Sequence, residues 1–209
     1  DDDEDGDDDS STSLTIRELC NQLRANDPGL LRHSSTFPPS NYIAGCSEAD
    51  EIEVFQALKE NTQVKDIQLW LSGYTESSAE AAAKYLECSK TLQKIDLRFS
   101  SYYQELPAVI SLLLRALSCN ASVKELSVDI TSVSLASVAF QELLMCTQTL
   151  QKLHIFDFEY EELSEVQTAA IASGFTNNTT LRNVGFQSWR EADLAPVLTV
   201  LRDHPALQK

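Results

Sequence analysis

The chain repeats one short phrase, and this repetition limits the folds that are open to it. KTLQKIDL at 90–97 and QTLQKLHI at 148–155 share the letters TLQK and begin 58 residues apart. The leading apolar residue of each related phrase serves as an anchor, and the six anchors are separated by 28, 31, 27, 31 and 26 residues: Val64, Leu92, Val123, Leu150, Leu181 and Leu207. Periods of roughly 20–50 residues indicate an array of stacked repeats.

The residues around each anchor show two different periods. Paired apolar side chains stand three and five residues after an anchor, as in Ile95 and Leu97, and this alternation is typical of a short strand. Apolar residues ten and six positions before each anchor are four apart, which is helical spacing; they are Val54/Leu58, Ala82/Leu86, Leu113/Leu117, Phe140/Leu144, Ile171/Phe175 and Val197/Leu201. Each unit therefore predicts a helix, a tight turn, a short strand and a loop.

A single unit of this kind cannot bury its apolar side, but stacked units bury theirs in one shared core. We therefore expect an α/β solenoid with short parallel strands side by side and all helices on one side of the sheet. Ser47, followed by Asp50 three residues later, predicts a capping box at a helix start. Pro107 fits the first turn of another helix.

The phrases TLQKIDL, SVKELSV, TLQKLHI and TLRNVGF, each followed by a long helix, resemble leucine-rich repeats of the ribonuclease-inhibitor type over about residues 48–209. The resemblance implies a horseshoe with strands on the concave face and helices on the convex face. It also implies protein binding, whether as capture of a basic protein, as a sensor-receptor domain, or as regulation of a small GTPase or of actin. This chain departs from the pattern where FSSYYQELPAV and FEYEELSEV lengthen two units, and it lacks the Asn or Cys expected after each strand.

Three segments are expected along the chain. Residues 1–11 predict a disordered acidic tail, because like charges repel and nothing apolar can be buried there. Residues 12–46 predict an N-terminal helical cap or an irregular first repeat, with a helix over 12–27. Residues 47–209 predict five to six repeats, of which the last is incomplete; its ending at HPALQK suggests a fragment or further repeats beyond this sequence.

Charge and cysteine usage narrow the partners and the compartment. The formal charge is −16, and DDDEDGDDD alone carries eight carboxylates. Nucleic acid is therefore disfavoured, whereas a basic protein partner would be attracted. The sequence contains no apolar run of about 18 residues, so it predicts no membrane span. The five cysteines lack metal or disulfide spacing and predict reduced thiols in a cytoplasmic or nuclear protein; they are Cys20, Cys46, Cys88, Cys119 and Cys146.

Catalytic chemistry is not expected. Cys88, Cys119 and Cys146 recur four residues before an anchor and predict small core fillers, since a nucleophile would appear once beside a base. The histidines His33, His154 and His204 accompany no catalytic triad, phosphate loop or metal motif. Asn120 and Asn178 fall at helix-end turns, where Asn is favourable. We therefore expect no cofactor, no metal and no small-molecule substrate.

The strand positions expected to be exposed are the candidate binding residues, because adjacent units place them side by side on the concave face. Trp70 and Phe156 share one column, with Arg98 and Asp129 between them, and aromatic and Arg side chains are typical of binding hot spots. The alternative is that loops cover the two rings. The candidate residues are Asp66, Gln68, Trp70, Lys94, Asp96, Arg98, Glu125, Ser127, Asp129, Lys152, His154, Phe156 and Gln187.

The sequence thus favours a non-enzymatic protein–protein interaction scaffold that binds through the concave sheet, the acidic tail or both. The alternatives are a GTPase-activating or other regulatory repeat protein, and the sensing repeat domain of a larger multidomain protein.

Overall fold

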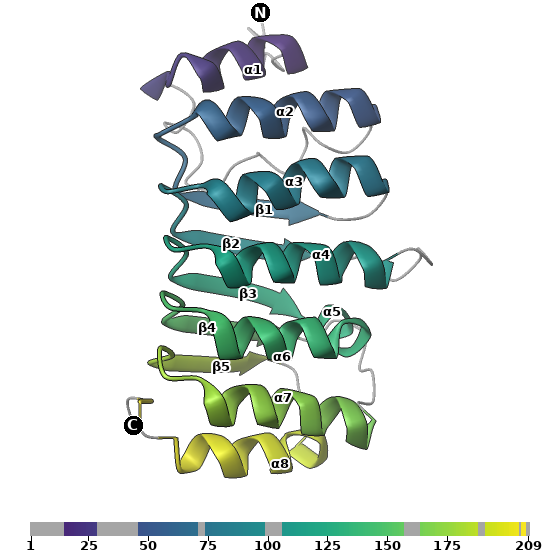
Figure 1. The fold of residues 1–209 in the computed structure, drawn as a ribbon, viewed down its shortest axis with the longest axis vertical. Coiled ribbons are helices and arrows are strands. Elements are labelled where there is room, and N and C mark those ends of the chain that lie inside the picture. Colours follow the sequence, from purple (N-terminus) through teal and green to yellow (C-terminus); the bar gives the residue numbers. More distant parts are fainter. Residues whose placement is uncertain are drawn as a thin grey trace, which may run out of the picture.

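The computed structural model describes residues 15–28, 46–70, 74–98, 106–156, 164–187, 191–204 and 206–207. Within these residues helices and strands alternate almost throughout (Figure 1). In chain order they are α1 (Ile16–Arg24), α2 (Glu48–Glu60), β1 (Asp66–Trp70), α3 (Glu76–Cys88), β2 (Lys94–Arg98), α4 (Leu106–Cys119), β3 (Glu125–Asp129), α5 (Ile130–Leu135), α6 (Ser137–Cys146), β4 (Lys152–Phe156), α7 (Glu165–Asn177), β5 (Asn183–Gln187) and α8 (Glu191–Arg202).

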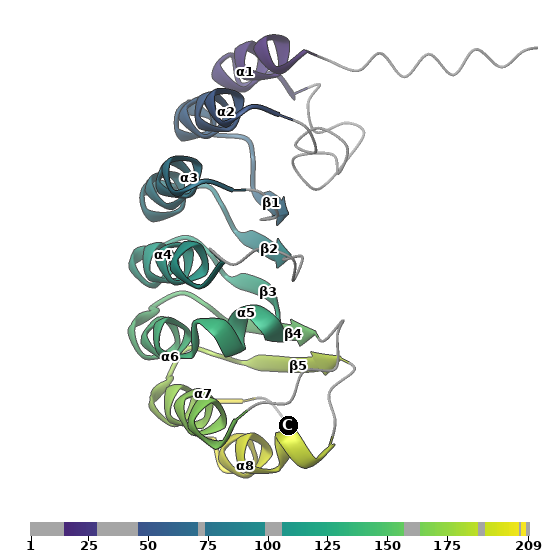
Figure 2. The same cartoon turned by 90° about the vertical axis from the view of Figure 1, so that its right-hand side faces the viewer.

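The five strands form one parallel sheet in the order β1-β2-β3-β4-β5. Figure 2 shows the long helices in one layer and the strands in the other, with the short helix α5 between them. Equivalent positions pair across the sheet without a slip, as in Ile67 with Ile95 and Leu126 with Leu153. The predicted α/β stack with a parallel sheet is therefore confirmed.

The core is built from the repeated apolar positions. The first five anchors are buried, as are the residues six and ten positions before them. The apolar pairs of β1 to β4 are buried too, whereas Val184 and Phe186 of β5 are half-buried and line a cavity against α8. Each buried Leu, Ile or Val contributes about 1.5–3 kcal/mol, so the stacked positions supply most of the driving force for folding.

The helix starts follow their sequence signals. Ser47 and Asp50 form the predicted capping box, with reciprocal bonds between side chain and backbone. The same arrangement opens α1, α3 and α7. Pro107 lies in the first turn of α4, as expected.

Two parts of the sequence behave differently from expectation or lie outside the description. Helix α5 follows β3 directly, in a stretch that the repeat pattern assigns to a loop; Val133 in this helix is buried, so tertiary packing overrides its weak helix propensity. Helix α1 lies within the predicted 12–27 segment and packs on α2 through Leu19, Cys20 and Leu23. The acidic tail and residues 29–45 lie outside the described residues.

One polar slot recurs at every turn from helix to strand, three residues before each anchor. It holds Asn61, Ser89, Asn120, Thr147, Asn178 and His204. In the asparagine units the side-chain Oδ1 accepts two backbone N–H groups of the turn, including that of the anchor. For Asn120 these donors are Ser122 N and Val123 N, both at 2.7 Å.

The asparagine amide also reaches the preceding coil. Asn61 Nδ2 donates to Leu23 O at 2.7 Å, Asn120 Nδ2 to Leu86 O at 2.6 Å, and Asn178 Nδ2 to Leu144 O at 2.6 Å. These carbonyls belong to helix ends, where the last C=O groups have no partner within the helix. Each asparagine therefore satisfies its own turn and the end of the neighbouring helix.

The serine and threonine units complement this arrangement. Ser89 N and Thr147 N donate to Tyr85 O and Leu143 O, which leaves the next carbonyl along each helix free for the following asparagine. In the asparagine units the backbone N–H of the slot residue instead donates to the equivalent carbonyl of its own helix, as Asn120 N does to Leu117 O. From Asn61 to Asn178 the two kinds of unit alternate, and in this order the helix ends before Asn120 and Asn178 are satisfied.

His204 takes the place of asparagine in the last unit. Its Nε2 lies 2.7 Å from Asn178 O, and its Nδ1 accepts the Ala206 N–H at 3.2 Å. A carbonyl only accepts and a backbone N–H only donates, so the ring is neutral with its proton on Nε2.

Replacing the buried asparagine should cost far more than replacing its exposed neighbour. We expect Asn178→Ala to lower the free energy of unfolding by about 3 kcal/mol, because buried Leu181 N and Leu144 O lose their partner. Asn177→Ala is the matched control, since Asn177 is exposed and bonds only within its own helix; about 0.5 kcal/mol is expected. Urea unfolding measures both, and equal losses would contradict the role of the slot.

The hydrogen-bonding role of His204 can be tested by substituting a residue that offers a similar donor and acceptor. His204→Asn should keep the free energy of unfolding within about 1 kcal/mol of the wild type, because asparagine offers the same acceptor and donor. His204→Ala should lower it by about 2 kcal/mol. Chemical denaturation of the three proteins at neutral pH decides this, and an Asn variant as unstable as the Ala variant would show that the ring acts only by packing.

Candidate functional site

The strand side chains that alternate with the core pairs point away from the helices and form what we call the outer sheet face. It comprises the thirteen residues predicted from the sequence together with Asn183 and Gly185. The strand register brings them into three rows across the sheet. The first row is Asp66, Lys94, Glu125, Lys152 and Asn183; the second is Gln68, Asp96, Ser127, His154 and Gly185; the third is Trp70, Arg98, Asp129, Phe156 and Gln187.

The first row alternates in charge along its first four members. Lys152 Nζ lies 2.6 Å from Glu125 Oε1 on the neighbouring strand. Both side chains are well exposed, so this ion pair contributes at most about 1 kcal/mol to stability. The row presents both signs of charge to solvent and attracts neither sign strongly.

The third row places a guanidinium between two aromatic rings. Arg98 Cζ lies 5.3 Å from the centroid of the Trp70 ring and 5.7 Å from that of Phe156. Both distances fall within the range of cation–π attraction, worth about 0.5–2 kcal/mol each. Arg98 therefore links side chains of β1 and β4 across the sheet.

Asp96 fixes the direction of this guanidinium. Its Oδ2 accepts from Arg98 Nε at 3.1 Å and from Arg98 Nη2 at 2.9 Å, and more weakly from Gln68 Nε2 at 3.4 Å. The Asp96 side chain is 16% exposed and that of Arg98 32%. Among the described residues Asp96 Oδ1 is buried without a hydrogen-bond partner. Arg98 is thus held in place before any partner arrives.

At the end of the second row, Gly185 packs against the His154 ring. A Cβ atom at Gly185 would lie 2.9 Å from His154 Cδ2, so only glycine leaves room for the imidazole at this position. The His154 ring in turn lies 6.0 Å from the Phe156 ring. His154, Gly185 and Phe156 therefore pack as one group beside the Arg98 side chain.

Side-chain exposure separates the predicted residues that a partner could contact from those that are buried in the free chain. Trp70 is 40% exposed, whereas Phe156 and Asp129 are only 6% and 3% exposed. Two of the predicted contact residues are therefore buried in the free chain. Phe156 holds Arg98 from one side, and Trp70 is the aromatic side chain that a partner could reach.

The cysteines do not fill the core as predicted. Cys88, Cys119 and Cys146 are exposed, and only Cys20 is buried. The reason is helical geometry: each lies two residues, or about 200°, beyond the buried leucine of its helix. Burial, together with the nearby Glu53 carboxylate, raises the pKa of Cys20 to about 11, which makes this thiol a poor nucleophile.

Metal and membrane chemistry find little support in the described part of the chain. No group of three His, Cys, Asp or Glu side chains there could hold a metal ion. No helix within it combines the length and apolarity needed to cross a bilayer.

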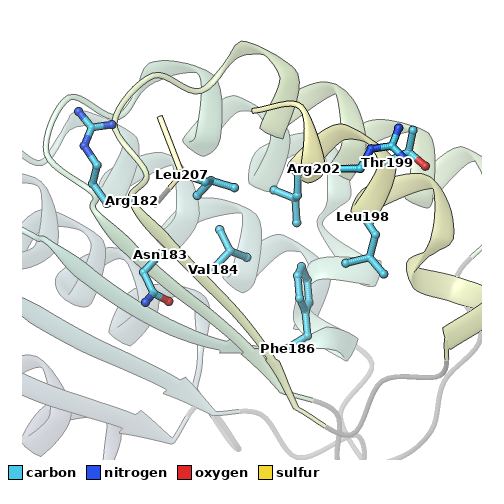
Figure 3. A pocket seen from close by; sticks show the side chains of 9 residues that line it. Arg182, Asn183, Val184, Phe186, Leu198, Thr199, Arg202 and Leu207 are labelled. Carbon is cyan, nitrogen blue, oxygen red and sulfur yellow. The ribbon is translucent and has the colours of Figure 1, made fainter. Parts of the chain in front are cut away.

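A cavity of about 550 Å³ lies between β5 and α8. Figure 3 shows Val184 and Phe186 pointing into it from β5, with Leu198 facing them from α8. Leu207, the sixth anchor, also lines it, and Arg182 and Arg202 lie at its margin. Val184 and Phe186 occupy core positions of the fifth coil and Leu207 that of the sixth, so the cavity continues the shared core and gathers no catalytic groups.

Comparison with known proteins gives structural likenesses only. No protein-family model matches the chain, and no curated protein matches it. Among solved structures, the leiomodin-1 actin-binding site 2 is similar with a TM-score of 0.48 and 18% identity, covering 92% of this chain and 90% of that one. The tropomodulin C-terminal domain of Caenorhabditis elegans has a TM-score of 0.49 and 15% identity, covering 91% and 93%.

Proposed function

We propose that the chain is a non-enzymatic protein-binding scaffold whose partner docks on the outer sheet face around Trp70 and Arg98. The observation that carries this proposal is the exposed Trp70 ring beside a guanidinium already fixed by Asp96. Tryptophan and arginine dominate binding hot spots because they bury large areas and lose little freedom when preorganised.

The finer architecture is part of the same proposal. We infer a leucine-rich-repeat horseshoe of the ribonuclease-inhibitor type, with the outer sheet face concave and the helices convex. The near-28-residue period and the alternating units support this. A stacked sheet of this kind offers a broad rigid surface for a protein rather than a closed pocket for a small molecule.

The proposed cellular location and the proposed role of the acidic tail are inferred from the residue types in the sequence. An intracellular location, cytoplasmic or nuclear, is supported by five cysteines that are all free thiols. Residues 1–11 would add long-range attraction for a basic partner. The alternative functions, a GTPase regulator or the sensing domain of a larger protein, use the same surface and differ in the consequence of binding.

Substitution of the hot spot should weaken partner binding selectively. We would measure the affinity of the intact chain for purified actin, a small GTPase and a histone, one for each protein class that the family resemblance suggests. For the protein that binds, Trp70→Ala and Arg98→Ala should each raise the dissociation constant at least about tenfold. The matched control is Met145→Ala, because Met145 is similarly exposed but lies on α6 in the helix layer.

Three outcomes would contradict the proposal or redirect it. Equal affinities of the Trp70→Ala variant and the wild type would remove the outer sheet face as the docking site. Binding that disappears on deletion of residues 1–11 but survives Trp70→Ala would assign recognition to the tail. Faster GTP hydrolysis by the small GTPase would favour the regulatory alternative.

A further inference from the structure

We propose that the helix layer carries a second docking site, a groove between α3 and α4 that takes an amphipathic helix of a partner protein. The partner helix would present an apolar stripe flanked by Lys or Arg. This site is independent of the proposed function, because it lies in the layer opposite the strands (Figure 2).

The groove is open and mostly apolar. Its volume is about 740 Å³. Buried Ala79 and Val109 form its floor with half-buried Leu112, and exposed Pro107 and Ala108 lie on the α4 side. Ala79 has no exposed surface, so the apolar surface that the side-chain ridge of a third helix could reach is that of Leu112, Pro107 and Ala108.

Several other contacts between neighbouring helices carry polar bridges or close packing at their surface, although a smaller furrow of about 180 Å³ also lies between α2 and α3. Between α3 and α4 no side-chain hydrogen bond or ion pair is present among the described residues. At the α6–α7 contact, a Cβ at Gly174 would lie 2.9 Å from Leu144 Cδ1, so those helices touch. The bridges elsewhere are Arg24–Glu53 at 3.4 Å, Glu48–Thr75 at 2.7 Å, Arg115–Glu142 at 3.0 Å and Gln141–Ser173 at 3.0 Å.

Charge complementarity selects a basic occupant. Glu76 and Glu80 line the α3 side of the groove, and both are exposed. Glu80 is paired with Lys84 at 3.6 Å, and Arg115 on the α4 side is paired with Glu142 at 3.0 Å. Helix α2 adds five carboxylates and one lysine nearby, and α3 holds three carboxylates and one lysine. This local excess of negative charge attracts a cationic helix and repels an acidic one.

A designed peptide tests the groove directly. The probe is a fluorescently labelled helix of about 18 residues with leucine at helical spacing and lysine beside it; the comparison peptide replaces every lysine with glutamate. Anisotropy titration of the intact chain should show binding of the lysine peptide and none of the glutamate peptide. Ala108→Arg should weaken binding at least about tenfold, because it adds bulk and positive charge at the groove.

Paired variants separate the groove from general charge. Glu76→Gln combined with Glu80→Gln should weaken binding about fivefold. The control pair, Glu87→Gln with Glu165→Gln, removes the same charge from exposed helix positions outside the groove and should change affinity less than about twofold. Trp70→Ala should also bind the lysine peptide like the wild type, whatever its effect on the outer sheet face.

Two results would overturn the inference. One is equal binding of the lysine peptide to the wild type, Ala108→Arg and both charge pairs, which would assign the attraction to the acidic tail. The other is comparable binding of the glutamate peptide, which would remove the charge complementarity. Circular dichroism of each variant shows that it is folded before it is titrated.

Discussion

The structure depends on the polar slot that lies between each helix and the strand after it. The chain leaves a helix and enters a strand within a few residues, so backbone N–H groups of the turn and the last carbonyls of the helix are all buried without regular partners. An unsatisfied buried group costs about 1–3 kcal/mol. Asn61, Asn120 and Asn178 satisfy these groups across two coils at once, and Ser89 and Thr147 leave the neighbouring carbonyl free for them. Hydrophobic burial drives the stack together, but these amides fix how each coil sits on the next.

A fixed stacking distance has a direct consequence for the sheet. Because no strand slips, side chains from different coils meet in rows with neighbours about 4.8 Å apart. Arg98 is long enough to contact rings on β1 and β4 only because those rows are in register. The arrangement around Trp70 is therefore a product of the repeat and would not survive a shift of one residue in any coil.

The sequence was most informative where a residue's environment is set by its own coil. Spacing alone assigned Leu92, Ile95 and Leu97 to the core. The pair Ser47 and Asp50 predicted a helix start. Positions whose environment depends on a neighbouring coil were less accessible. The burial of Phe156 beside Arg98 and the bond from His204 to Asn178 involve partners 26 or more residues away. A signal for His204 did exist, since it stands three residues before an anchor, where the other units place asparagine, serine or threonine.

The two layers differ in what could make a partner bind. The outer sheet face carries four carboxylates against three basic side chains, so its net field is weak and recognition there must come from the fit around Trp70. The helix layer near α2 and α3 is dominated by carboxylates, so a partner is drawn there by a field that salt screens within about 10 Å. A partner can fit around Trp70 only if the strands keep the register that the asparagines fix. Attraction of a charged partner to the helix layer requires only the groove between α3 and α4. A change that loosens the stack should therefore impair the sheet surface before it impairs the helix layer.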